Sequence, residues 1–191
     1  MKRLLGSLLV AGTLLAVAVR PARADIVAVY LQGQGGLSSA SGDTANHASS
    51  PSSGSPALGL QLGLRALIFE GYVDYDRFGD GVGVQRGIFG LRGGFGTTGL
   101  RLVLRGGVGG LLEQGGALTD RLPGVPDRRG VVARAGASLE GKVATALWLG
   151  AGLDAEAFSV APSTSGIFSG SNTVHGTDVF ASLRLLFELG I

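Results

Sequence analysis

Cysteine is absent from this 191-residue chain, and lysine is almost absent beyond its N-terminal segment. Without cysteine the fold has no disulfides, which small exported domains often need for stability. After Ala24, Lys142 is the single lysine, whereas a soluble surface usually carries many. No apolar run after Ala24 approaches the ~20 residues of a membrane-spanning helix. These shortages argue against an ordinary soluble domain and against a helical membrane protein.

The N-terminal segment from Met1 to Ala24 has the features of a cleaved secretory signal. Lys2 and Arg3 precede an apolar run from Leu4 to Val19, and Ala22-Arg23-Ala24 ends in the small-x-small pattern of a cleavage site. We therefore predict a signal peptide at residues 1–24 and one domain at residues 25–191.

Removal of the signal changes the charge balance. Four of the 16 basic residues leave with it, so 12 remain against 14 acidic residues, a net charge of −2. The basic isoelectric point belongs largely to the signal, and nothing indicates binding to nucleic acid.

What the remaining chain has in abundance is alternation with a period of two. Leu58, Leu60, Leu62 and Leu64 are separated by glycine, glutamine and glycine, so all four leucines fall on one face of an extended strand. Leu100, Leu102 and Leu104 repeat the pattern, as do Leu147, Leu149 and Leu153, and then Leu183, Leu185 and Phe187. A helix would need spacings of three and four residues, which these windows lack. The pattern predicts strands at 26–35, 57–65, 67–77, 85–96, 100–110, 130–140, 146–158 and 176–188.

The connections between these strands alternate in length. We expect loops at 36–56, 78–84, 111–129 and 159–175, and tight turns near Ala66, at 97–99 and at 141–145. The segment 37–56 is rich in serine, glycine and alanine, which is typical of a mobile surface loop. Long loops at one rim and short turns at the other are the pattern of an all-β, eight-stranded antiparallel up-and-down transmembrane β-barrel.

The face opposite the leucines carries balanced charge and many glycines. In a narrow barrel, glycine leaves room for long arginine side chains, and a guanidinium can bind a carboxylate through two hydrogen bonds. Buried charges of both signs would neutralise one another and fill the lumen, giving a plugged interior. The predicted interior network is Arg65, Arg86, Arg92, Arg101, Arg105, Arg134, Arg184, Glu70, Asp74, Asp76, Glu140, Asp154, Glu156 and Asp178. The predicted lipid-facing residues are Leu58, Leu60, Leu62, Leu64, Leu100, Leu102, Leu104, Leu147, Leu149, Leu153, Leu183, Leu185 and Phe187.

Aromatic residues on the leucine face fall at two levels. Phe69, Phe95 and Phe187 lie near the turn ends of their strands, while Tyr75 and Phe89 lie nearer the loops. Two levels of aromatic residues are typical of the interfacial girdles of a membrane barrel.

On this pattern the chain resembles the small eight-stranded outer-membrane barrels of the OmpA/OmpX-like class in the porin-like superfamily, from Asp25 to Ile191. The resemblance implies a bacterial outer-membrane location, with lipid and the barrel assembly machinery as partners, and a non-enzymatic role in structure or surface contact. The extracellular partner is unknown. Such barrels usually end in an aromatic residue that the assembly machinery recognises. This chain instead ends in Ile191, with Phe187 on the same face.

Two other functions fit parts of the sequence. A lipid A-modifying barrel enzyme would use His175 with Thr177 and Glu156, although a nucleophile and base must meet within ~3 Å. A soluble periplasmic barrel that binds a lipophilic ligand would point the leucines inward.

We expect no cofactor and no metal. The segment from Gly94 to Gly99 matches a dinucleotide fingerprint by letter but precedes a strand, so we interpret it as a turn with a left-handed glycine. Asp74, Asp76 and Asp80 could attract calcium, but the first two are more simply partners of arginine.

Overall fold

In the computed structural model, the described residues are 27–42, 54–79, 82–114, 128–162 and 173–190. They form eight strands, and they include no helix long and apolar enough to span a membrane. The strands are β1 (Val27–Gly42), β2 (Ser55–Ala66), β3 (Phe69–Phe78), β4 (Gly83–Gly96), β5 (Leu100–Gln114), β6 (Arg128–Ala144), β7 (Leu147–Pro162) and β8 (Val174–Gly190).

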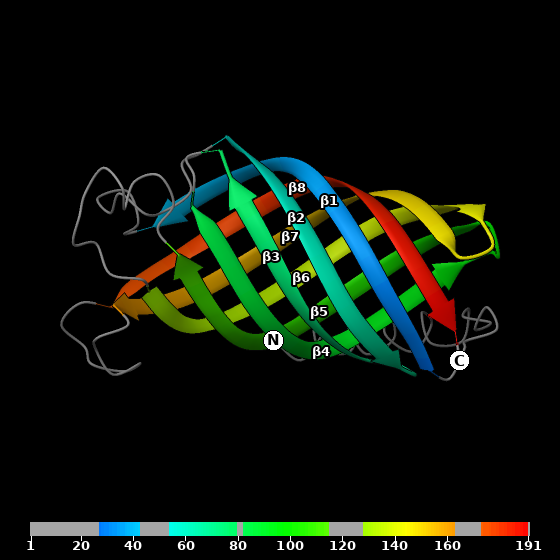
Figure 1. The fold of residues 1–191 in the computed structure, drawn as a ribbon, viewed down its shortest axis with the longest axis horizontal. Coiled ribbons are helices and arrows are strands. Elements are labelled where there is room, and N and C mark those ends of the chain that lie inside the picture. The colour runs from blue at the N-terminus through cyan, green and yellow to red at the C-terminus, as the bar shows by residue number, and fades with distance from the viewer. Residues whose placement is uncertain (1–26, 43–53, 80–81, 115–127, 163–172, 191) are drawn as a thin grey trace, which may run out of the picture.

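Each strand pairs with its sequence neighbours in the antiparallel sense, and β8 closes on β1. The result is a closed barrel (Figure 1), in which every strand has two partners and no edge is left unpaired. The predicted fold class and strand count are confirmed. The tight turns lie at one end of the barrel, beside the C-terminus at the right of Figure 1.

The strands are strongly tilted, and the register measures the tilt. Following register partners around the barrel from Tyr30 leads to Gly176 on β8, which pairs with Gly42. The path leaves β1 at Tyr30 and returns to it at Gly42. The offset of 12 residues (42 − 30) is the shear number of the barrel. With a strand spacing of ~4.8 Å and a rise of ~3.4 Å per residue, the shear corresponds to a tilt of roughly 45° and a radius of about 9 Å. A smaller shear of about 8 would give a radius of about 8 Å, so the observed register leaves more room for long interior side chains.

Several strands extend further toward the loops than the alternation predicted. β1 continues to Gly42, and Leu37 and Ser38 pair with Pro56 and Ser55 of β2. The interpretation of all of 37–56 as a mobile loop is therefore wrong at both ends, and residues 43–53 lie outside the described part. β5, β6, β7 and β8 are also longer than predicted at this end. Small residues of weak strand propensity join the ladder here because a paired neighbour satisfies their backbone groups.

The turn-side connections are short, and the left-handed glycine predicted for the turn between β4 and β5 is not found. Leu67 and Ile68 link β2 to β3, with Leu67 at a φ of 56°. Thr97 closes the next turn, where its hydroxyl accepts hydrogen bonds from the backbone N–H groups of Gly99 and Leu100. Gly96 before it has a φ of 146°, outside the left-handed helical region that we predicted for a glycine of this turn.

Candidate functional site

The barrel has a charged interior and an apolar exterior, and these two faces are the candidate functional surfaces. Every residue predicted for the interior network lies on the inward face of its strand. All are buried except Arg65 and Arg101, which are partly exposed near the turn-side rim. The interior thus follows the parity expected from the sequence.

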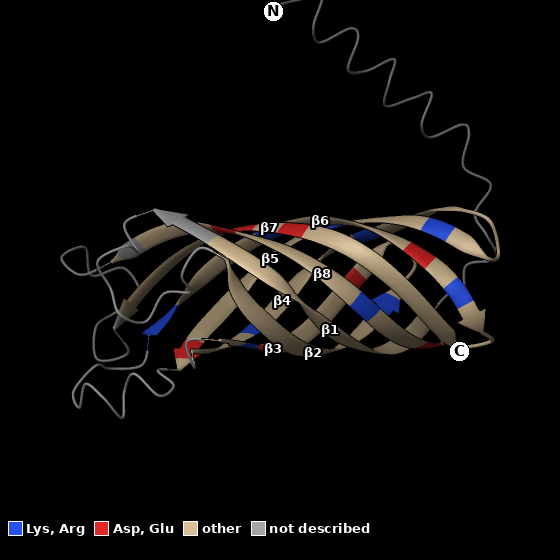
Figure 2. Ribbon diagram, turned by 90° about the horizontal axis from the view of Figure 1, so that it is seen from above, with Lys and Arg blue, Asp and Glu red and all other residues tan. Residues whose placement is uncertain are grey.

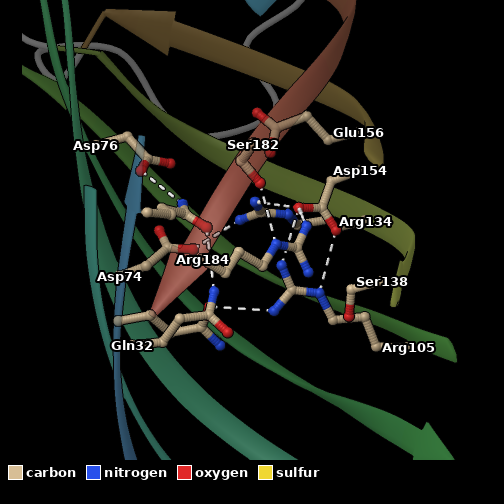
Figure 3. Close-up of polar contacts among 12 residues, drawn as sticks. Gln32, Asp74, Asp76, Arg105, Arg134, Ser138, Asp154, Glu156, Ser182 and Arg184 are labelled. Carbon is tan, nitrogen blue, oxygen red and sulfur yellow. Dashed lines mark hydrogen bonds and ion pairs between the residues drawn. The ribbon is translucent and has the colours of Figure 1, made fainter. Parts of the chain in front are cut away.

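Three arginines converge on one carboxylate at the centre of the barrel (Figure 3). Arg105 binds both oxygens of Asp154 through Nε and Nη2, at 3.1 and 2.9 Å. Arg134 donates to Asp154 Oδ2 at 3.1 Å, and Arg184 donates to the same oxygen. These three cations come from β5, β6 and β8. Ion pairs to one aspartate on β7 therefore link four strands.

A second part of this central network surrounds Arg86. Its Nη1 lies 3.1 Å from Asp74 and 2.6 Å from Asp76, and its Nη2 donates to Glu156 at 3.0 Å. Arg134 joins the two parts, since its other terminal nitrogen donates to Asp74 at 2.7 Å. Charge is therefore compensated continuously across the lumen, as buried ions require.

A separate chain of ion pairs runs toward the turn-side rim. Arg92 binds Glu70 at 3.0 Å and lies 3.5 Å from Glu140. Arg101 binds Glu140 at 2.8 Å through Nε and Glu188 at 2.7 Å through Nη2. Glu188 also accepts a hydrogen bond from Arg65 at 2.6 Å. The predicted network omits Glu188, although its parity in β8 is that of Arg184.

Asp178 is buried inside the barrel, and the group that donates a hydrogen bond to it is a hydroxyl. Ser38 Oγ lies 2.7 Å from its carboxylate. Ser38 falls in the predicted loop, so no sequence signal linked the two. The same extension of the strands adds Glu113 and Arg128, which lie 3.9 Å apart inside the loop end of the barrel.

Neutral polar and aromatic side chains complete the interior, and the sequence analysis missed them. Gln61 accepts a hydrogen bond from Arg105 at 3.1 Å and donates one to the hydroxyl of Tyr30 at 2.8 Å. Gln34 donates to Asp76 at 2.8 Å. Trp148 lies under the guanidinium of Arg101, 3.9 Å from the ring centroid. The inward parity of these residues was available in the sequence, but their neutral side chains gave no separate signal.

Interior glycines provide the space that long side chains occupy. A Cβ at Gly152 would overlap the guanidinium carbon of Arg184. One at Gly63 would overlap the ring of Tyr30. Any larger residue at either position would displace a neighbour that the network uses.

An apolar layer lies inside the barrel near the loops. Phe78, Phe180, Val84 and Leu111 are buried there, in one cluster with neighbouring apolar side chains. Two cavities beside this layer measure about 10 and 20 Å³, no more than room for a water molecule.

The exterior of the described wall is predominantly apolar. Every residue predicted to face lipid lies on the outward face, and all but Leu147, which is half-buried, are exposed. Leu60, Leu102 and Leu149 are 55%, 43% and 55% exposed, whereas Arg134 is 4% exposed. The soluble-carrier alternative requires the reverse orientation. Figure 2 shows charged segments as short interruptions in otherwise uncharged strands.

The predicted separation of the aromatic residues into two levels is wrong for Phe89. Its ring stacks on that of Phe69, with centroids 6.2 Å apart. The tilt of the strands brings residues from different positions along neighbouring strands to one place on the wall. The position of a residue within its strand is therefore a poor guide to its level along the barrel axis.

The residues considered for a lipid A-modifying site do not come together. Glu156 is inside the barrel, bound to Arg86, whereas His175 and Thr177 are exposed on the outward face of β8. No group of three or more potential metal ligands occurs among the described residues. Asp74 and Asp76 bind arginine instead, and Asp80 lies outside the described part.

No protein-family model and no curated protein matches this sequence. Among solved structures, the chain is similar to Neisserial surface protein A (NspA), with a TM-score of 0.57 at 12% identity over 84% of this chain and 97% of that one. Two structures from Pseudomonas aeruginosa also match. These are the N-terminal β-barrel domain of OprF (TM-score 0.49, 15% identity, 85% and 97% covered) and the outer membrane protein OprG (0.44, 10%, 86% and 96%). At such identity the likeness to NspA shows the fold alone. The predicted resemblance of the fold to the small eight-stranded outer-membrane barrels is confirmed.

Proposed function

We propose that this chain is a bacterial outer-membrane protein that crosses the membrane with its eight strands and has a structural or surface-contact role without catalysis. The observation that carries this proposal is the segregation of the side chains. Every carboxylate of the described residues points into the barrel or its rim, while large apolar side chains cover the outside.

The energetics of the exterior support a lipid environment. Soluble monomers rarely expose a continuous apolar patch above a few hundred Å². Here all eight strands present leucine, valine or phenylalanine outward, with examples at Leu58, Leu183 and Phe89 that are 71%, 69% and 62% exposed. Lipid would remove the cost of hydrating these side chains, and the closed ladder leaves no unpaired edge to the bilayer.

The interior supports a closed lumen. The central ion pairs and the layer of Phe78 and Phe180 occupy the cross-section, and the cavities beside them are water-sized. We therefore propose that the barrel does not conduct solutes. Function would then reside on the outer wall and in the loops, and we propose the loops as the surface for an extracellular partner.

Export and assembly complete the proposal. Residues 1–24 lie outside the described part, and their removal after Ala24 stays a prediction. We propose that the barrel assembly machinery recognises β8 through its outward aromatic Phe187, since this side chain is 45% exposed near the C-terminal end of that strand.

Membrane fractionation with heat-modifiable gel mobility tests the proposal. The protein should be found in the outer-membrane fraction and migrate differently before and after boiling, because a closed barrel resists detergent until heated. Recovery from a detergent-free periplasmic extract would contradict it. Planar-bilayer recordings on the same purified protein should show no stable conductance, and steady ion-selective openings would reject the closed lumen.

A further inference from the structure

The exposed charges of the described residues are all positive. Arg77 and Arg129 lie on the outward face of β3 and β6 near the loop end, and Lys142 is exposed near the turn-side rim. No aspartate or glutamate in the described part shares this exposure. A charge on the lipid side of a barrel wall is costly unless it lies near the interface, and Arg77 and Arg129 both lie near the loop end of the wall.

A groove in the outer wall is lined in part by Arg129. Its volume is about 660 Å³, within the range of ligand-binding sites. Gly87 and Gly110 pair across β4 and β5 and form its floor, and a Cβ on either would meet nothing within 4 Å. The groove exists because two glycines oppose each other where neighbouring pairs carry larger side chains.

The walls of the groove divide by chemistry. Leu60, Leu62 and Val73 line one side with apolar surface. Tyr75, Gln85, Leu112 and Arg129 form a row of register partners across β3, β4, β5 and β6 on the side nearer the loops. Arg77 follows two residues after Tyr75 on the same face of β3.

We propose that this groove binds an acyl chain of an anionic, phosphate-bearing lipid in the outer leaflet, with a phosphate held by Arg129 and with Arg77 adding positive charge at the same end of the wall. A guanidinium binds phosphate through two parallel hydrogen bonds, and a long arginine stem reaches from the wall to the headgroup level. The apolar walls and bare glycine floor receive the chain. This inference rests on the proposed outer-membrane location, which places the loop end of the barrel in the outer leaflet.

Native mass spectrometry of the folded barrel in a zwitterionic detergent tests the inference with lipid A as the anionic probe and phosphatidylcholine as the neutral comparison. The test variants are Arg129→Gln, which removes the cation, and Gly110→Leu, which fills the groove. The matched controls are Gly106→Leu, outward on the same strand, and Lys142→Gln, an exposed cation at the opposite end. The contact nearest to a Cβ at Gly106 would be a carbonyl oxygen 3.8 Å away, so this control is sterically tolerated.

The wild type should retain lipid A in preference to phosphatidylcholine. Each test variant should bind it about tenfold more weakly, since each loses one charged or packing interaction. The controls should bind like the wild type, and heat-modifiable mobility of every variant establishes that it is folded. Equal retention by the test variants and the wild type would overturn the inference, as would equal binding of both lipids. Either result leaves the outer-membrane proposal standing, whereas loss of membrane fractionation would remove both.

Discussion

Replacing Asp154 with asparagine should destabilise the barrel more than any other neutralising change of a single interior carboxylate. Asp154 accepts four hydrogen bonds from three guanidinium groups. In the variant, Arg134 still has a hydrogen bond to the Asp74 carboxylate, and Arg105 still has one to Gln61. Arg184 retains only its hydrogen bond to the hydroxyl of Ser182 and has no carboxylate partner. Removing one partner of a buried ion pair costs about 3–5 kcal/mol, and we expect a loss of about 4 kcal/mol in the free energy of unfolding.

The control for this change is Asp178→Asn. Asp178 is about as deeply buried as Asp154, but a serine hydroxyl donates to it, and an amide can still accept that hydrogen bond. We expect a loss of about 1 kcal/mol. The double variant Asp154→Asn with Arg184→Met should recover part of the stability, because it removes the guanidinium that the first change leaves without a carboxylate.

Urea titrations in phosphatidylcholine vesicles, followed by the gel mobility of the folded form from both the folded and unfolded directions, measure these differences. A loss at Asp154 equal to that at Asp178 would refute the reasoning. So would a double variant less stable than the single variant. Either result would mean that water, rather than Asp154, compensates the arginine charge in the lumen.

Three further perturbations test the outer wall and the interior packing. Leu102→Arg should lower the free energy of unfolding in vesicles by about 2–4 kcal/mol, because it places a charge against lipid. Leu37→Arg, near the loop rim, should lower it by about 1 kcal/mol or less. Equal losses for the two variants in urea titrations would contradict a lipid-facing wall. Gly63→Val should cost about 1–3 kcal/mol, since its Cβ would overlap the ring of Tyr30, and a wild-type urea midpoint would show that the interior repacks freely. Brominated acyl chains should quench the fluorescence of Trp148 only weakly, because this side chain points inward and is 8% exposed. They should strongly quench the fluorescence of a tryptophan introduced by Leu102→Trp in a Trp148→Phe background. Stronger quenching of Trp148 than of this introduced tryptophan would mean that the inward and outward faces are assigned the wrong way round.

The two faces of the barrel were predictable from local sequence because side chains alternate along a strand without reference to any partner. The leucines around Leu60 and Leu102 indicated the outward parity, and the arginines and carboxylates between them indicated the inward one. The same rule would have placed Glu188 and Gln61 inside, since both share a parity with charged neighbours. The strand count followed from short turns and longer loops, which need no long-range information.

The pairing of the interior charges was decided only by the closed structure. Asp154 meets arginines from three other strands, and the shear of the barrel sets which of them reach it. That register is a property of all eight ladders together, so no window of sequence contains it. The extension of β1 to Gly42 likewise depends on β2 and β8 lying beside it, because serine and glycine become strand only when neighbours satisfy their backbone. Local alternation thus determines which way each side chain points, while closure of the cylinder determines what it meets.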